Sequence, residues 1–144
     1  MIAIVCSEFN SRVTNGLLKG CLVALNKDGV SSEEIDIYKV PGAFELPGKV
    51  KLLARGDTSY DAIITLGCVI KGETDHYHYI SQAVTDGIMS LTIGLDSDYP
   101  KIIFGVLTCQ SKELAIARSD SNMDKNKGYE AGKAALKMIS TKKD

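Results

Sequence analysis

The sequence has no excess of charge of either sign and no long apolar run. Its 17 Lys and Arg residues nearly balance 18 Asp and Glu residues, which leaves a net charge of −1. Such a chain has no overall field to attract nucleic acid or an anionic membrane surface, so we expect neither partner. No apolar run approaches the ~20 residues of a transmembrane helix, so we expect no membrane span.

The sequence also lacks the cysteine and histidine spacings that are typical of metal sites. Cys6, Cys21, Cys68 and Cys109 are spaced neither as metal ligands nor as a redox pair, so we expect no metal site. Packing as small buried side chains is favoured over a nucleophilic role. This spacing, and a start that does not read as a secretory signal, favour a reducing, cytoplasmic compartment.

Short apolar segments alternate with longer amphipathic segments along the whole chain. We expect strands at residues 2–6, 35–40, 62–66 and 102–107. Helices are expected at 13–25, 43–54, 75–95, 113–118 and 129–139, with a loop at 96–100 and solvated lysines near the C-terminus (Lys133, Lys137, Lys142, Lys143). Strands that alternate with helices predict one α/β domain spanning 1–144. Its expected architecture is three-layer α/β/α and flavodoxin-like, with a four-stranded parallel sheet and helices on both faces.

Ligands of such sheets bind just beyond the carboxyl ends of the strands, so the turns there are the most informative segments. In the first turn, Phe9 could stack on a flat heterocycle, but on the turn alone a side chain folded against the core is favoured. After the second strand, Glu45 opens a helix, where the helix dipole alone would account for its charge.

The stretch 67–79, Gly-Cys-Val-Ile-Lys-Gly-Glu-Thr-Asp-His-Tyr-His-Tyr, follows the third strand and opens a helix. Backbone N–H groups at the start of a helix suit an anion such as a phosphate. His76 could move protons beside that anion, although it could also be an ordinary residue of the first helical turn. Thr74 and Asp75 could simply cap the helix. His78 lies on another side of a helix, so the two histidines cannot share one ligand.

Two more residues near the fourth strand have open interpretations. Arg118 could form a surface ion pair, or its planar guanidinium could bind a phosphate. Phe104 lies within the strand and is favoured as a core residue. The pattern alone therefore predicts an α/β domain that binds a phosphorylated small molecule.

Several motifs together resemble the 6,7-dimethyl-8-ribityllumazine synthase family of riboflavin biosynthesis. They are Glu-Phe-Asn at 8–10, Val-Pro-Gly-Ala-Phe-Glu-Leu-Pro at 40–47, Tyr-Asp-Ala-Ile-Ile-Thr-Leu-Gly-Cys-Val-Ile-Lys-Gly-Glu-Thr-Asp-His at 60–76, Phe-Gly-Val-Leu-Thr at 104–108, Ala-Ile-Ala-Arg at 115–118 and Asn-Lys-Gly at 126–128. The resemblance covers nearly the whole chain. It implies a transferase that condenses 5-amino-6-(D-ribitylamino)uracil with 3,4-dihydroxy-2-butanone 4-phosphate, without a metal or an organic cofactor.

The resemblance also implies the roles of single residues. His76 matches the proton-transfer position. The residues at substrate-binding positions are Phe9, Ala43, Phe44, Glu45, Cys68, Val69, Ile70, Glu73, Thr74, Phe104, Arg118 and Lys127. Phe9 would stack on the pyrimidine, residues 43–45 would hold the ribityl chain and ring edge, and residues 68–70 would line the heterocycle pocket mainly through backbone atoms.

The same resemblance implies that the phosphate end of the site is shared between chains. Glu73 and Thr74 would offer backbone N–H groups to the phosphate, and Arg118 would complete its charge compensation. Phe104, Arg118 and Lys127 would come from a neighbouring subunit, because family sites lie between adjacent members of a ring of five. Homo-oligomerisation is therefore expected.

Two departures from the family pattern favour a free pentamer over a sixty-subunit shell. Many members carry a strand before the first core strand, whereas here the core begins almost at Met1. Segment 119–125 also differs from the Gly- and Lys-containing turn of shell-forming members and is one residue longer.

Two other functions remain open at the level of the sequence. One is a flavodoxin-like module that binds a flavin or a ribityl compound, although the turn Ser-Glu-Phe-Asn at 7–10 lacks the Ser/Thr/Gly-rich phosphate loop of such carriers. The other is a catalytically silent shell protein, against which Glu45, His76 and Arg118 argue.

Overall fold

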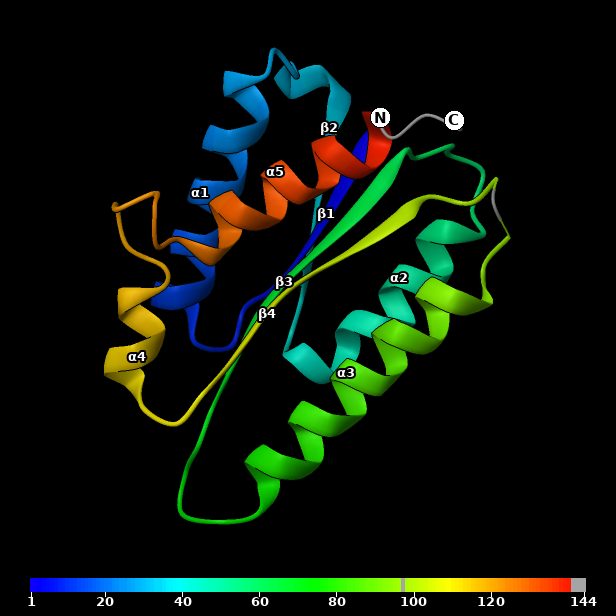
Figure 1. The fold of residues 1–144 in the computed structure, drawn as a ribbon. Helices are drawn as coiled ribbons and strands as arrows, with labels where there is room; N and C mark the ends of the chain where they lie inside the picture. The colour runs from blue at the N-terminus through cyan, green and yellow to red at the C-terminus, as the bar shows by residue number, and fades with distance from the viewer. Residues whose placement is uncertain (97, 141–144) are drawn as a thin grey trace.

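A computed structural model describes residues 1–96 and 98–140, in which four strands form one sheet (Figure 1). The strands are β1 (Ile2–Ser7), β2 (Ile35–Val40), β3 (Ala62–Ile70) and β4 (Lys101–Cys109), and their order in the sheet is β2-β1-β3-β4. Each of the three pairings between neighbours is parallel. The predicted four-stranded parallel sheet is therefore confirmed.

Helices cover both faces of this sheet (Figure 1). The helices α1 (Ser11–Lys27), α4 (Lys112–Ala117) and α5 (Lys127–Ser140) lie on one face, and α2 (Leu46–Ala54) and α3 (His76–Gly94) lie on the other. Short 3-10 turns, η1 (Ser32–Glu34) and η2 (Ala43–Glu45), precede β2 and α2. The predicted three-layer α/β arrangement is confirmed. No helix in the described ranges is both long enough and apolar enough to pass through a bilayer.

Alternation along the central strands divides the core between the two faces. In β1, Ile2 and Ile4 pack in the apolar cluster under α1 and α5, whereas Ala3 and Val5 pack in the cluster under α2 and α3. Successive side chains of a strand point to opposite faces, so a strand covered on both sides is apolar at nearly every position.

The third strand is longer than predicted, so its expected end at residue 66 is wrong. Residues 67–70 continue the strand because they pair with residues 106–109 of β4, whereas the pairing with β1 stops at Leu66. The last part of β3 therefore has one edge that β1 leaves open. This open edge lies where ligands of parallel sheets bind.

Several other boundaries also differ by a few residues. The helix expected from residue 43 begins with the 3-10 turn η2, and the last helix starts at Lys127 rather than at 129. The fourth strand extends over Lys101–Cys109 and the short helix over Lys112–Ala117. Ser97, within the expected loop, and Lys142 and Lys143 lie outside the described residues.

Helices α1 and α5 approach each other closely through glycines, although they lie far apart in the sequence (Figure 1). A Cβ atom on Gly128 would collide with the carbonyl oxygen of Leu17, and one on Gly132 would lie 2.8 Å from the Cβ of Ala24. Side chains at these positions would force the helices apart, so the contact depends on glycine.

Candidate active site

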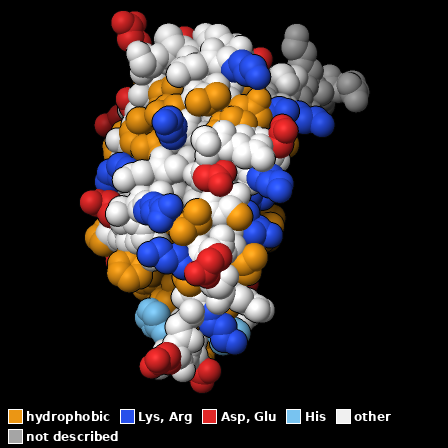
Figure 2. Space-filling model, turned by 90° about the vertical axis from the view of Figure 1, so that its left-hand side faces the viewer, with side chains coloured by type: hydrophobic (Ala, Val, Ile, Leu, Met, Phe, Trp, Pro, Cys, Tyr) orange, Lys and Arg blue, Asp and Glu red, His pale blue; other side chains and the backbone are white. Residues whose placement is uncertain are grey.

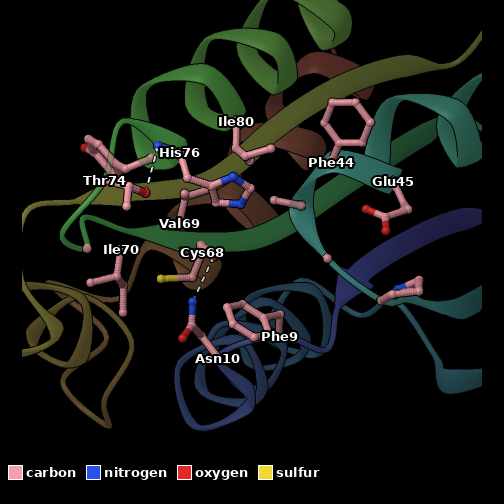
Figure 3. A pocket seen from close by; sticks show the side chains of 15 residues that line it. Phe9, Asn10, Phe44, Glu45, Cys68, Val69, Ile70, Thr74, His76 and Ile80 are labelled. Carbon is pink, nitrogen blue, oxygen red and sulfur yellow. Dashed lines mark hydrogen bonds between the residues drawn. The ribbon is translucent and has the colours of Figure 1, made fainter.

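A cavity of 570 Å³ lies at the carboxyl edge of the sheet, where three of the four expected turns meet (Figure 3). Its lining comes from the turn after β1, the segment after β2, the end of β3 and the start of α3. The lining residues are Phe9, Asn10, Pro41, Gly42, Ala43, Phe44, Glu45, Cys68, Val69, Ile70, Gly72, Thr74, His76, Tyr77 and Ile80. The structure thus brings together nine of the predicted site residues, His76 among them. We refer to this space as the first cavity.

The turn after β1 is fixed in place by hydrogen bonds to both neighbouring strands. The backbone N–H groups of Glu8 and Phe9 donate to the carbonyl oxygens of Val40 and Pro41, at 2.8 and 2.9 Å. The side-chain amide of Asn10 donates to the carbonyl oxygen of Cys68 at 3.1 Å (Figure 3). The ends of β1, β2 and β3 are therefore tied together around the cavity.

Asn10 is a site residue that the sequence analysis did not assign. Its backbone has φ 63° and ψ 49°, which is the left-handed region that asparagine tolerates better than most residues. The signal available was an asparagine in a turn before a helix, but its hydrogen bond to Cys68, 58 residues away, leaves no trace in the local pattern.

Two aromatic side chains that line the first cavity are exposed to solvent. The side chain of Phe9 is 72% exposed and that of Phe44 is 59% exposed. The interpretation that Phe9 folds back against the core is therefore wrong. An exposed aromatic ring that lines a cavity offers a flat apolar surface on which a heterocycle can stack.

The open edge of β3 forms one wall of the first cavity. Cys68, Val69 and Ile70 line it, and β1 does not pair with this part of the strand. Asn10 already occupies the carbonyl group of Cys68. Backbone groups on an unpaired strand edge can bind a planar ligand that has donors and acceptors along its rim.

His76 is the first residue of α3, and its imidazole lines the first cavity (Figure 3). Its backbone N–H donates to the hydroxyl oxygen of Thr74 at 3.3 Å, whereas Asp75, at the N-cap position of α3, makes no capping hydrogen bond with its side chain. The imidazole thus reaches the cavity at a helix N-terminus, where partial positive charge favours a nearby anion. His78, two positions along, stacks edge-on against Tyr77.

The predicted cationic residues lie elsewhere, around a second cavity of 680 Å³. This second cavity lies between the end of β4, the end of α4 and the start of α5. Its lining residues are Val106, Leu107, Thr108, Cys109, Ala117, Arg118, Asp124, Lys125, Lys127 and Glu130. In the described part of the chain, Glu73 and Phe104 line neither cavity. Phe104 is 38% exposed, so it is not the fully buried core residue that its place in a strand favoured.

The basic side chains around the second cavity do not belong to a large positively charged surface. One guanidinium nitrogen of Arg118 donates to the carbonyl oxygen of Leu114 at 3.0 Å, and the Lys127 ammonium lies 3.0 Å from a carboxylate oxygen of Glu130. In Figure 2, which views the molecule from the side of α4, basic and acidic side chains alternate without a large patch of one sign. An anion there would depend on individual side chains.

The thiols near the two cavities are unsuited to nucleophilic chemistry at neutral pH. All four cysteines are buried. Burial, together with the nearby Cys109, raises the pKa of the Cys68 thiol to about 12. Burial also raises the pKa of Cys109, although Arg118 partly opposes the rise. A thiol reacts as its thiolate, so these pKa shifts support the interpretation of the cysteines as packing residues.

Burial of Cys21 predicts a loss of stability at alkaline pH. Burial, with a smaller effect of Cys6, raises the pKa of the Cys21 thiol from 9.0 to about 12. The unfolded chain therefore loses this proton first, so stability is intact below pH 9 and falls as the pH rises towards 12. For one such thiol, the free energy of unfolding should fall by up to about 1.4 kcal/mol per pH unit.

Denaturant unfolding between pH 7 and 10, at one protein concentration, would measure this fall. A Cys21→Ala variant should be less stable at every pH because of the cavity it leaves, but its stability should fall less steeply above pH 9. Equal slopes in both chains would contradict the assignment to Cys21.

Residues 1–96 and 98–140 contain no group of three or more His, Cys, Asp or Glu side chains that could hold a metal ion. The described residues that line the first cavity contain one carboxylate, Glu45, and one imidazole, His76. The site therefore offers stacking surfaces, backbone donors and one group suited to proton transfer.

Comparison with known families agrees with this geometry and with the motifs. The family model for 6,7-dimethyl-8-ribityllumazine synthase matches residues 1–143. The match includes the turns that line both cavities. Because it extends over nearly the whole sequence, the chain belongs to the 6,7-dimethyl-8-ribityllumazine synthase family of transferases, which act in riboflavin biosynthesis.

Proposed function

We propose that this chain condenses 5-amino-6-(D-ribitylamino)uracil with 3,4-dihydroxy-2-butanone 4-phosphate, forming 6,7-dimethyl-8-ribityllumazine and releasing phosphate. The observation that carries the proposal is the first cavity, which combines an exposed aromatic ring, an open strand edge and an imidazole at a helix N-terminus. Each of these features suits one part of the two substrates.

The pyrimidine substrate is assigned to the wall between Phe9 and the end of β3. Its flat ring would stack on the exposed Phe9 side chain, and its polar rim would face the backbone of residues 68–70. The ribityl chain would lie along Ala43, Phe44 and Glu45, which come from the segment after β2. The carboxylate of Glu45 can accept hydrogen bonds from ribityl hydroxyl groups.

The chemistry requires proton transfers rather than a strong nucleophile from the protein. An amine of the pyrimidine attacks the ketone and water leaves to give an imine. Phosphate is then eliminated, and the second amine attacks the remaining carbonyl carbon and closes the ring with loss of a second water. An imidazole can accept and donate protons near neutral pH, which suits His76 for these steps. Alignment of the two reactants would supply much of the remaining acceleration, for which orientation can contribute ~7–11 kcal/mol.

The phosphate end of the reaction is assigned to Glu73, Thr74 and Arg118. Glu73 and Thr74 come just before α3, where backbone N–H groups are suited to an anion. Arg118, Lys127 and Phe104 do not line the first cavity of their own chain. We propose that a neighbouring copy supplies these three residues, so that one site combines the first cavity of one chain with the second cavity of the next.

A direct assay tests the proposed function. The purified protein would be mixed with both substrates, and the fluorescent lumazine product would be followed against a control without enzyme, because this condensation proceeds slowly unaided. Acceleration over the control is expected. If a correctly folded oligomer gave no acceleration, the proposed reaction would be wrong, and a flavin-binding or purely structural role would take its place.

Membership of the family implies a homo-oligomer. We propose a free pentamer, supported by the unusual segment at 119–125, and a reducing compartment such as the cytoplasm, supported by the four free thiols. Light scattering should give a mass near five times 15.5 kDa. A particle in the megadalton range would contradict the pentamer and indicate a shell.

A further inference from the structure

The segment that joins α4 to α5 carries the three cations that line the second cavity, which are Arg118, Lys125 and Lys127. Arg118 follows α4, and Lys127 opens α5. The backbone N–H of Lys127 donates to the carbonyl oxygen of Arg118 at 2.8 Å, which closes the segment into a compact loop. The relative position of Arg118 and Lys127 is therefore set by how this loop is held on the domain.

Asn126 is the residue that anchors this loop. Its side chain is fully enclosed, with only 2% of the residue exposed. The amide nitrogen donates to the carbonyl oxygen of Asp120 at 2.8 Å and to that of Gly16 in α1 at 3.2 Å. The amide oxygen accepts from the backbone N–H of Tyr129 at 3.0 Å, which makes Asn126 the cap of α5.

Close packing against α1 leaves this amide little freedom to move. A Cβ atom on Gly20 would collide with the side-chain oxygen of Asn126, and one on Gly16 would collide with the carbonyl oxygen of Ser119. The two glycines therefore leave room on α1 for the loop. The Asn126 amide is buried, makes three hydrogen bonds and is tightly packed. It therefore fixes the position of the backbone on either side of it.

We propose that Asn126 is a positioning residue that holds Arg118 and Lys127 in the arrangement that binds the phosphate group of the substrate. The inference rests on the proposed function for the identity of the anion. Asn126 would not touch the substrate. It would act by fixing where α5 starts and how the loop returns to the end of α4.

Two substitutions disturb the anchor in different ways. Asn126→Ser keeps an oxygen to cap α5 but removes both donated hydrogen bonds. Gly20→Ala does not change Asn126 itself, but the added Cβ atom on α1 would push the Asn126 side-chain amide out of its position. Gly48→Ala is the matched control for the glycine change, because a Cβ atom at Gly48 would have no neighbour within 4 Å. Val50→Ala, in the core under α2 and α3, controls for a general loss of stability.

The test measures binding of inorganic phosphate by ³¹P NMR, on variants shown by light scattering to keep the wild-type oligomer. In Asn126→Ser and Gly20→Ala, the Kd for phosphate should rise about tenfold, as expected when a charged hydrogen-bonding group loses its alignment. The Kd should stay unchanged in Gly48→Ala and Val50→Ala. A purely structural role for Asn126 would lower stability without changing this Kd.

Unchanged phosphate binding in folded Asn126→Ser and Gly20→Ala would overturn the inference, as would failure of the wild-type chain to bind phosphate. Because the measurement needs no turnover, it is separate from the proposed function. A wild-type chain that binds phosphate through the anchored loop but forms no lumazine would contradict the proposed reaction and leave the role of Asn126 standing.

Discussion

Replacing Arg118 by alanine should lower kcat/KM for the butanone phosphate by roughly 10²–10³-fold, as loss of a donor aimed at developing charge does in other enzymes. The guanidinium lines the second cavity and donates a hydrogen bond to the carbonyl oxygen of Leu114, within the preceding helix α4. In the proposed site, the guanidinium stabilises the negative charge of the leaving phosphate. The side chain is exposed, so the free energy of unfolding should change by less than about 0.5 kcal/mol.

Steady-state kinetics with each substrate varied in turn would measure this effect. An Arg118→Lys variant keeps the charge but loses the planar fork, so it should recover only part of the activity. If Arg118→Ala had wild-type kinetics, or if it affected only the KM of the pyrimidine, the assignment of Arg118 to the phosphate would be wrong.

Replacing His76 by alanine should slow the reaction within roughly 10²–10⁴-fold, the range of general acid–base catalysis. The imidazole lines the first cavity, whereas His78 is not among the described residues that do so. A His78→Ala variant is therefore the matched control and should retain nearly full activity. The measurement is the rate of lumazine formation at saturating substrates. An unchanged rate in His76→Ala would refute the proton-transfer role.

The two variants together test whether the site is shared between chains. His76→Ala removes a group from the first cavity, and Arg118→Ala removes one from the second. If each site combines cavities from two copies, oligomers reassembled from a mixture of both variants contain some sites with both residues intact. Such mixtures should regain part of the activity that each variant lacks alone. No recovery in demonstrably mixed oligomers would contradict the shared site.

The architecture was predictable because its signals are local. Each strand is a short apolar segment, each crossover has helical periodicity, and turn residues separate them. The start of α3 was predictable for the same reason, since Thr74 and Asp75 are typical of the residues that precede a helix. These features fixed the positions of His76 and Phe9 at the carboxyl edge of the sheet.

What was not predictable depends on partners that are distant in the sequence. Residues 67–70 were expected to follow the strand rather than to belong to it, but pairing with β4 keeps them in the strand. The hydrogen bond from Asn10 to Cys68 joins two turns that no local pattern connects. Asn126 likewise bonds to Gly16 in α1, so its role could be seen only once α1 and α5 were placed together.

The pairing of α1 with α5 has a consequence for how the chain folds while it is synthesised on the ribosome. The apolar face of α1, including Leu17 and Cys21, is covered by the final helix, and the Gly16–Asn126 hydrogen bond spans 110 residues. At ordinary speeds of synthesis, that separation corresponds to roughly 5–20 s. During this interval α5 cannot cover the nascent α1, so the apolar face of α1 has the strands of the sheet to pack against but lacks its final cover until α5 has been made.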